Sequence, residues 1–283
     1  MPLGYSFQLV YIRVAMIRPR RISQSTLRQL AKLNHKKYRR AQRRFLIEGF
    51  HLVEEALESD WQIEMILMTP TALSKDIGRR LIEQAEKKNV EVAGISEPEA
   101  RKLSDTVTSQ GILAVVQVKE YAIESFWSSP NRRSLVVALD GISDPGNLGT
   151  ILRTCDWFGV DAVWLDPASV ELYSPKVVRS TMGSIFHLPV LPDVDLIMML
   201  RLAKKNGWKV MVTAPTDGSP IPRDAYAERS VIVFGNEAHG VGADIQREAD
   251  QRISVPRFGA AESLNVAVAC GVIVGAIRLS KGV

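Results

Sequence analysis

The most constraining feature of this sequence is a set of short apolar runs that alternate with helical patterns in its second half. A strand with one wet face alternates apolar and polar residues, whereas these runs are apolar almost throughout, which indicates strands buried on both faces. With helices between them, they predict an α/β fold with a parallel sheet covered on both sides. The runs lie at residues 135–140, 162–165, 209–213 and 231–234.

The C-terminal segment extends this pattern. A short strand ends at Pro256, a loop rich in glycine and alanine follows, and Val266 to Leu279 reads as a helix that is apolar almost all round. Such a helix is expected to be buried. Ser263 and Asn265 come just before it, where a helix start leaves backbone N–H groups unpaired. They can simply cap the helix, but a buried helix start beside polar side chains can also hold a ligand. The uncharged run is shorter than the roughly 20 residues of a membrane span.

The first half of the chain reads as a smaller α/β unit. Helical patterns alternate there with apolar runs at 45–49, 63–68, 90–93 and 112–118. A polar, turn-forming stretch then separates this unit from the second half and predicts a linker. The predicted divisions are an extension that we expect to be poorly ordered (1–24), a first domain (25–118), a linker (119–134) and a second domain (135–283).

A basic cluster lies near the start of the first domain. Its members are Lys36, Lys37, Arg39, Arg40, Arg43 and Arg44. Phosphate backbones attract clustered Lys and Arg because each contact releases counterions. A solvated helix face is a common alternative for such a cluster. Tyr38 among the charges, and the position at a domain edge, favour an RNA-binding surface. The net charge of the chain is only +5, so the distribution of charge matters more than its total.

The cysteines and histidines indicate neither disulfides nor a zinc site. Cys155 and Cys270 each fall in an apolar helical pattern, which is typical of reduced core residues in a cytoplasmic protein. The four histidines lack the spacing of metal ligands. Arg13 interrupts the apolar stretch near the N-terminus and no small-residue cleavage site follows it, which argues against a secretory signal. We expect a cytoplasmic protein with no metal and no membrane partner.

Ligands of parallel sheets gather at the carboxyl ends of the strands. Three of these ends carry small or turn-forming residues, so that the backbone can approach a ligand closely: 213–215, 235–237 and 255–256. Two familiar nucleotide loops fail on inspection. Gly141 and Gly146 have P-loop spacing, but Asn147 and Leu148 stand where Lys and Ser or Thr are required. The dinucleotide pattern that starts at Gly240 has Ile245 at its third glycine position.

Three segments remain that the fold alone does not require. A turn at Asp144–Asn147 precedes a helix predicted from Leu148 to Phe158, and Arg153 lies off its apolar stripe, as a surface arginine also would. Glu237 follows a buried strand directly, where a turn with a capping acid is the alternative. The third segment is the polar pair at the start of the last helix.

Together these segments resemble the SpoU family of the SPOUT superfamily, S-adenosylmethionine-dependent RNA ribose 2′-O-methyltransferases. The three motifs of the family stand here as Asn147…Arg153, Gly235-Asn236-Glu237…Gly240, and Val255-Pro256 with Ser263-Leu264-Asn265. They occur in the expected order across residues 135–280. On fewer landmarks, residues 25–118 resemble the RNA substrate-binding domain found in part of this family.

The resemblance implies a fold and a site that the residues alone would not suggest. The second domain is expected to contain a deep trefoil knot, an exception to the general rule against threaded loops. Subunits are expected to pair through this region as a homodimer. The residues expected to line the S-adenosylmethionine cofactor are Thr213, Gly235, Val255 and Leu264. Arg153 corresponds to the catalytic arginine of the family. The residues expected to position Arg153, the ribose and the cofactor loops are Asn147, Glu237, Ser263 and Asn265.

The implied reaction is in-line transfer of a methyl group to a ribose 2′-oxygen, for which the enzyme aligns the two reactants and helps the hydroxyl lose its proton. A guanidinium is a very poor base, with a pKa above about 12. We therefore favour Arg153 gripping the target phosphate and orienting the hydroxyl, and base catalysis stays open. Ribosomal RNA is favoured over tRNA, because the tRNA enzymes of the family generally lack the first domain.

Two alternatives stay open: a tRNA 2′-O-methyltransferase, and a non-catalytic RNA-binding or ribosome assembly factor of the same fold. The presence of the motif residues argues against the second. Arg257 stands where many relatives have a more apolar run, and it is a further candidate for contact with RNA.

Overall fold

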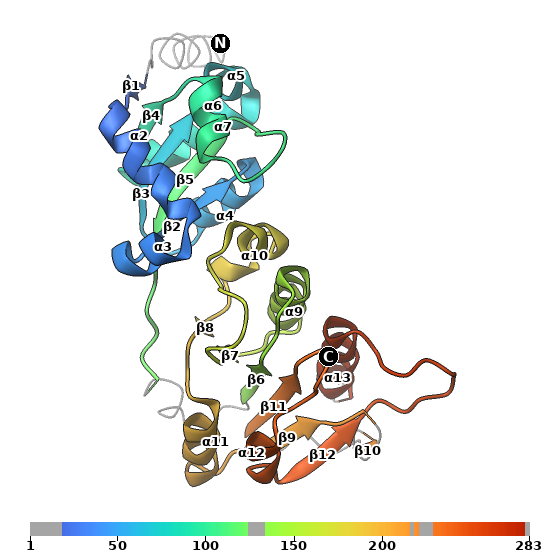
Figure 1. Ribbon diagram of the computed structural model, residues 1–283. Coiled ribbons are helices and arrows are strands. Elements are labelled where there is room, and N and C mark those ends of the chain that lie inside the picture. Colours follow the sequence, from blue (N-terminus) through green and yellow to red (C-terminus); the bar gives the residue numbers. More distant parts are fainter. Residues whose placement is uncertain (1–18, 124–133, 216–217, 221–228, 281–283) are drawn as a thin grey trace, which may run out of the picture. The chain divides into compact units, whose positions relative to one another are not determined.

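The computed structural model describes residues 19–123, 134–215, 218–220 and 229–280 (Figure 1). This part of the chain divides between Lys119 and Glu120 into two compact units, with Tyr173–Pro175 grouped with the first. Residues 1–18 of the expected N-terminal extension and residues 124–133 of the predicted linker lie outside the described residues.

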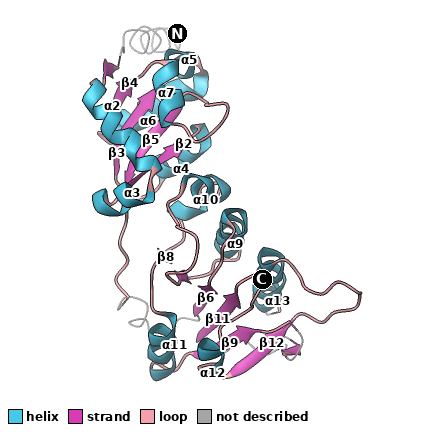
Figure 2. Ribbon diagram, viewed as in Figure 1, coloured by secondary structure: helices cyan, strands magenta, loops and turns pink. Residues whose placement is uncertain are grey.

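The first unit is built on a five-stranded mixed sheet (Figure 2). Its strand order is β1 (Arg20–Arg21), β4 (Glu91–Gly94), β3 (Ile63–Met68), β5 (Ile112–Gln117) and β2 (Arg44–Glu48). The antiparallel pairs are β5 with β2 and β5 with β3, and the other pairs are parallel. The helices are α2 (Gln24–Ala31), α3 (Lys36–Gln42), α4 (Phe50–Glu58), α5 (Pro70–Ser74), α6 (Asp76–Lys87) and α7 (Glu97–Leu103), with a 3₁₀ turn at Lys32–Asn34.

The start of this unit differs from the expected boundary at residue 25. Arg20 and Arg21 pair in parallel with Ala93 and Gly94 of β4, and α2 begins at Gln24. Ser23 caps this helix by accepting a hydrogen bond from the backbone N–H of Thr26 at 3.0 Å. Residues 20–24 are therefore folded against the sheet.

The carboxylate of Glu99 links the start of α7 to the N-terminal segment of this unit. Glu99 in the first turn of α7 accepts hydrogen bonds from the Ser96 backbone N–H and the Ser96 hydroxyl, both at 2.8 Å. It also accepts from Gln24 at 2.7 Å and from Arg21 at 3.2 Å. The backbone and hydroxyl of Ser96 contribute most to lowering the pKa of Glu99 to about 2, against an opposing effect of burial.

The second unit is built on a seven-stranded sheet in which every pair is parallel. Its order is β10 (Ser219–Pro220), β12 (Gln251–Ser254), β9 (Lys209–Thr213), β11 (Arg229–Gly235), β6 (Ser134–Asp140), β7 (Ala162–Leu165) and β8 (Val190–Leu191). The helices are α9 (Pro145–Trp157), α10 (Pro175–Ser180), α11 (Leu196–Lys205), α12 (Ala243–Arg247) and α13 (Val266–Leu279), with a 3₁₀ turn at Ser184–Phe186. The predicted parallel α/β sheet is confirmed.

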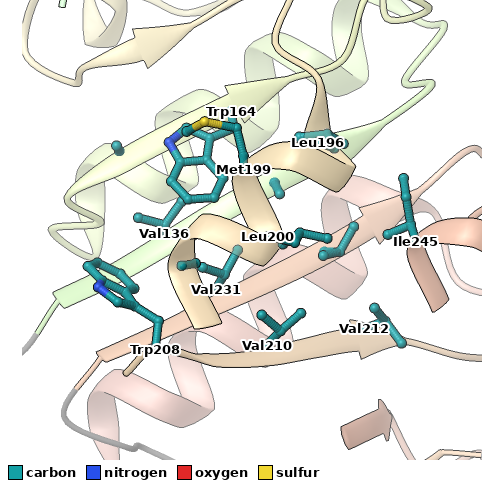
Figure 3. Close-up of a cluster of buried hydrophobic side chains, with 14 of the residues drawn as sticks. Val136, Trp164, Leu196, Met199, Leu200, Trp208, Val210, Val212, Val231 and Ile245 are labelled. Atoms are coloured by element: carbon teal, nitrogen blue, oxygen red, sulfur yellow. The ribbon is translucent and has the colours of Figure 1, made fainter. Parts of the chain in front are cut away.

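Both faces of this sheet are covered, as the apolar runs predicted. On one face the strand residues pack with α11 and α12, and Figure 3 shows Val136, Val231, Met199 and Leu200 among this cluster. Side chains that alternate with them along the strands, such as Val137, are also fully buried. Period-2 geometry puts these on the opposite face.

One predicted helix starts earlier than expected. The helix predicted from Leu148 begins at Pro145, and Asp144 is its N-cap, accepting from the Asn147 backbone N–H at 2.8 Å. The sequence Asp-Pro-Gly-Asn also suits a turn, but Asp at the N-cap with Pro at the first helical position is a favoured helix start. Asn147 therefore lies in the first turn of α9 rather than in a preceding loop.

The prediction that α13 is buried holds for one of its faces. Cys270, Ile273 and Ile277 are buried, and this helix packs against α9 and β11. Its other face is exposed in the single chain: Val268, Val272 and Leu279 expose 52%, 44% and 63% of their surface. Cys155 and Cys270 are both buried free thiols, and burial together with the neighbouring Cys270 raises the pKa of Cys155.

Candidate active site

Three segments that are far apart in the sequence meet at the carboxyl edge of the second sheet. Asn147 in α9 donates a hydrogen bond from Nδ2 to Oε1 of Glu237 at 2.8 Å. Asn265, just before α13, donates from Nδ2 to Oδ1 of Asn147 at 2.9 Å. The structure thus brings three of the predicted site residues into one hydrogen-bonded group, which we call the Asn–Glu–Asn network.

The direction of every hydrogen bond in this network is fixed by its two ends. At one end Asn265 Oδ1 accepts the backbone N–H groups of Ala267 at 2.9 Å and Val268 at 3.3 Å, which can only donate. Its amide nitrogen must then face Asn147. At the other end a carboxylate can only accept, so the amide nitrogen of Asn147 faces Glu237. The network therefore joins the N-termini of α13 and α9 to the acidic residue that follows β11.

Glu237 is held in its ionised form. Partial burial alone would raise its pKa, but the hydrogen bonds from Asn147, from its own backbone and from Ser143 outweigh burial, and the net pKa is lowered. The Ser143 hydroxyl donates to Oε2 at 3.2 Å. The carboxylate also lies beside the start of α9, where the helix dipole favours a negative charge.

Two residues of this site were not among the predicted catalytic or cofactor-binding residues. One is Ser143, whose hydroxyl falls between the end of β6 and the N-cap of α9. The other is Asn236, which shapes the loop that carries Glu237: its Nδ2 donates to the Gly141 carbonyl at 2.7 Å and its Oδ1 accepts from the Ala238 backbone at 2.8 Å. The signal in both cases was a small polar residue in the turn that follows a buried strand, directly after it for Asn236 and three residues after it for Ser143.

Gly235 has a steric reason to be glycine. A Cβ at this position would lie 2.1 Å from the Gly240 carbonyl carbon, well inside any permitted contact. The backbones of Asn236 and Gly240 bridge each other at 3.0 and 2.9 Å and close the loop. The loop therefore packs on itself at the strand end, with Glu237 turned toward Asn147.

Three other predicted site residues lie outside the Asn–Glu–Asn network. Arg153 is exposed on α9, six residues or between one and two turns after Asn147. Ser263 is exposed in the loop before α13, outside the hydrogen bonds of the network. Thr213 is half-buried at the end of β9, and its hydroxyl donates to the Val233 carbonyl at 3.0 Å.

Residues predicted to line a cofactor start from neighbouring strands. The strands β12, β9 and β11 are adjacent and parallel, so the ends at Val255, Thr213 and Gly235 share one edge of the sheet. Backbone groups, small residues and the half-exposed Leu264 suit an adenine and a sulfonium better than a bare phosphate. Within the described ranges no group of three or more His, Cys, Asp or Glu could hold a metal ion.

The basic cluster of the first unit is only partly available to a ligand. Lys36, Lys37, Arg40 and Arg43 are exposed. The prediction for Arg39 is wrong: its side chain is buried and donates to the Leu33 carbonyl at 2.7 Å, so it stabilises the fold. Arg44 is half-buried and pairs with Glu64 at 2.6 Å, which also makes it a structural residue.

The parallel sheet and the polar network at its carboxyl edge are typical of α/β proteins that bind their ligands at the strand ends. Residues 134–275 match the SpoU rRNA Methylase family, and residues 24–114 match the MRM3-like substrate binding domain. The chain belongs to the SpoU rRNA methylase family, as its three motifs predicted.

Relatives cover nearly the whole chain. It is 36% identical over 248 residues to the 23S rRNA (guanosine(2553)-2′-O)-methyltransferase RlmP of Bacillus subtilis, covering 87% of this chain and 93% of RlmP. The structure of an AdoMet-bound rRNA methyltransferase from Sinorhizobium meliloti is 26% identical, with a TM-score of 0.79 over 92% of this chain and 96% of that one. The SpoU methyltransferase AviRb of Streptomyces viridochromogenes, 22% identical with a TM-score of 0.78 over 92% and 98% of the two chains, shows the same fold.

These relatives establish the chain as an RNA methyltransferase whose methyl donor is S-adenosylmethionine. Among the described residues, no helix is both long and apolar enough to pass through a membrane.

Proposed function

We propose that the protein methylates the 2′-hydroxyl of a ribose in 23S ribosomal RNA. The observation that carries this proposal is the Asn–Glu–Asn network, which unites the three motif segments at the edge of the sheet in a chain whose relative RlmP acts on 23S rRNA. S-adenosylmethionine, when bound, supplies a methyl group already activated on a sulfonium. The protein then has mainly to align the two reactants.

Within this proposal the network is a positioning device. It holds the first turn of α9 against the start of α13, and α9 carries Arg153 on its exposed side. The guanidinium of Arg153 would grip the phosphate of the target nucleotide and orient the 2′-hydroxyl, because a planar cation with five N–H donors suits a phosphate and is a poor base. Ser263 would contact the ribose from the loop that ends at Asn265.

The cofactor would lie against the strand ends of β9, β11 and β12. Gly235 allows the Gly240 backbone to pack closely, which keeps the loop after β11 tight at the edge of the sheet. Thr213, Val255 and Leu264 would supply the remaining wall. Binding through backbone and apolar contacts leaves the polar network for the substrate.

The proposal includes a knotted second domain that pairs as a homodimer in the cytoplasm. The exposed apolar face of α13 supports the pairing, since Val268, Val272 and Leu279 lie on it, and Trp157 on the neighbouring α9 exposes 84% of its surface. Covering these side chains removes apolar surface from water. Size-exclusion chromatography with light scattering should give twice the chain mass, and Val272→Glu should return the monomer.

The first unit would bind the RNA through Lys36, Lys37, Arg40 and Arg43, as a substrate-binding domain that spans residues 25–118. Replacing Lys36 and Lys37 by alanine should lower the slope of log affinity against log salt concentration by about two, because each phosphate contact contributes roughly one. The matched control replaces Lys87 and Lys102, two exposed lysines of α6 and α7, and should leave the slope unchanged. Equal effects of both pairs would contradict a specific surface.

The direct test uses a 23S rRNA transcript and S-adenosylmethionine labelled in its methyl group. A 2′-O-methyl group blocks alkaline cleavage at its own position, so the label should appear in an alkali-resistant dinucleotide. Arg153→Ala should abolish this product. Label in a mononucleotide would indicate base methylation, label only in tRNA would redirect the substrate, and no transfer to either RNA would indicate a non-catalytic RNA-binding factor.

A further inference from the structure

The loop between β12 and α13 carries side chains that this mechanism does not use. In Figure 1 the loop reaches out beyond the sheet before it returns to α13. Every residue from Pro256 to Asn265 is exposed. Phe258 exposes 98% of its surface, which is unusual for a large aromatic residue.

Both ends of this loop are fixed. At its start the hydroxyl of Ser254 donates to the Gly218 carbonyl at 2.8 Å, and β12 pairs with β9 and β10. At its end Asn265 caps α13 and donates to Asn147 of the network. A group that binds to the middle of the loop is therefore tied to the active site by a few residues of chain.

The surroundings of Phe258 leave its ring open. Arg257 precedes it and Nη1 of that residue donates to the Ala261 carbonyl at 3.4 Å, which links the two sides of the loop and leaves other guanidinium N–H groups for a ligand. The residues that follow are Gly259 and Ala260, and a Cβ added to Gly259 would meet nothing within 4 Å. The loop thus presents an uncovered aromatic ring beside a cation.

We propose that Phe258 stacks on a nucleobase of the RNA substrate close to the methylated ribose, while Arg257 pairs with a phosphate of the same strand. The inference rests on the proposed function and states how the target strand is held. Bases splayed out of single-stranded RNA commonly stack on aromatic side chains, and the neighbouring phosphates attract Arg. Because every base has a flat face, this contact would position the strand without reading its sequence.

Two other binding partners for the Phe258 ring fit the observations less well. A second copy of the chain would favour a continuous apolar patch, such as the exposed face of α13, whereas Phe258 is flanked by Arg257 and by small residues. The adenine of the cofactor would favour the edge where Thr213 and Gly235 end their strands, whereas Phe258 lies in the exposed loop between β12 and α13. An isolated ring next to a cation matches a single nucleotide.

The test compares Phe258→Ala, Phe258→Leu and Phe258→Trp in the full-length protein with the 23S rRNA transcript. Losing one stacked base should raise the KM for RNA about 10- to 100-fold in the Ala variant, whereas the Trp variant keeps a ring and should stay close to wild type. The Leu variant keeps the apolar bulk without a flat face and should resemble Ala. Met198→Ala, which truncates another exposed apolar side chain on α11, should leave KM unchanged.

Three further measurements distinguish RNA from the cofactor and from a second copy of the chain as the partner of Phe258. Calorimetric affinity for S-adenosylmethionine, the chain mass in solution and the melting temperature should be the same for wild type and Phe258→Ala. A Leu variant as active as wild type, a matching loss of cofactor affinity, or a dissociated dimer would overturn the inference while wild-type methyl transfer leaves the proposed function in place. Absence of transfer by the wild-type protein would overturn the proposed function and this inference with it.

Discussion

Glu99 in the first unit and Glu237 in the second both have carboxylates that accept hydrogen bonds near the start of a helix, and both have a lowered pKa. Their partners differ. Glu99 accepts hydrogen bonds from Ser96 in its own helix turn and from two residues of the adjoining N-terminal segment, and it is well shielded. Glu237 accepts from Asn147 and Ser143, which are about ninety residues away, and it lies exposed.

The difference shows how the same residue type stabilises a fold in one place and prepares a site in another. Removing Glu99 should leave local helix ends unsatisfied, which affects folding. Removing Glu237 should release two segments whose relative placement sets the direction of Arg153, which affects the reaction.

The largest effect is expected from Glu237→Ala. Loss of the carboxylate frees the first turn of α9. A shift of about 1 Å in a catalytic group, even when caused by a mutation away from the reacting atoms, can lower a rate about 100-fold. We expect kcat to fall by about this factor with little change in the affinity for S-adenosylmethionine. A melting temperature close to wild type should accompany it. If kcat is unaffected, or if the protein unfolds, Glu237 is not a positioning residue.

A smaller effect is expected from Asn265→Asp. Aspartate caps a helix as well as asparagine does, so α13 should keep its stability. It has no N–H to donate to Asn147, and the loss of one hydrogen bond worth about 1.4 kcal/mol corresponds to roughly a tenfold lower rate. Asn265→Ala, which removes both the cap and the link, is the comparison variant and should also lower the melting temperature. Equal melting temperatures for the two variants would contradict the view that Asn265 stabilises α13 through its cap and supports the reaction through its hydrogen bond to Asn147.

Glu99→Ala should lower stability and leave the rate of methyl transfer unchanged, the reverse of Glu237→Ala. The variant loses the hydrogen bonds at the start of α7 and should lower the free energy of unfolding by about 1–2 kcal/mol. Methyl transfer at a temperature where the protein stays folded should equal that of wild type. Urea titration and an initial-rate assay on the same preparation measure both quantities, and a loss of rate without a loss of stability would reverse the assignment.

The pH dependence of stability tests the same contrast through the charge of Glu99. The pKa of Glu99 is about 2 in the folded protein and about 4.3 when unfolded. A lowered pKa means that the stabilisation is present above the unfolded value and is lost as pH falls from about 5 toward 2. Glu99→Gln should therefore flatten the acid limb of the urea-unfolding curve against pH. An unchanged limb would show that the carboxylate of Glu99 does not contribute.

Much of the second unit follows from its apolar pattern. Continuous apolar runs predicted parallel strands buried on both faces, and the ends of those strands indicated where Glu237 and the loop before α13 would lie. The start of α9 did not follow, since Asp144 and Pro145 suit a turn and a helix start equally well. The hydrogen bond from the Asn147 backbone N–H to Asp144 belongs to the helix start, and whether a helix forms depends on the residues that follow Asn147.

Other features depend on contacts that a linear pattern does not contain. Asn236 acts on the Gly141 carbonyl, 95 residues away, so no local spacing reveals it. Arg39 belongs to a run of cations, and only the packing of α3 shows that its side chain is turned inward while its neighbours Lys36 and Lys37 are exposed. The charge pattern predicted a surface, but not which cations form it.

A double-mutant cycle between Asn265 and Glu237 in the rate of methyl transfer tests whether the Asn–Glu–Asn network acts as one unit. These residues touch only through Asn147, so the claim that they act as one network predicts that Asn265→Ala combined with Glu237→Ala is no slower than the worse single variant. Rate losses that multiply would show two independent contributions and would contradict a single network.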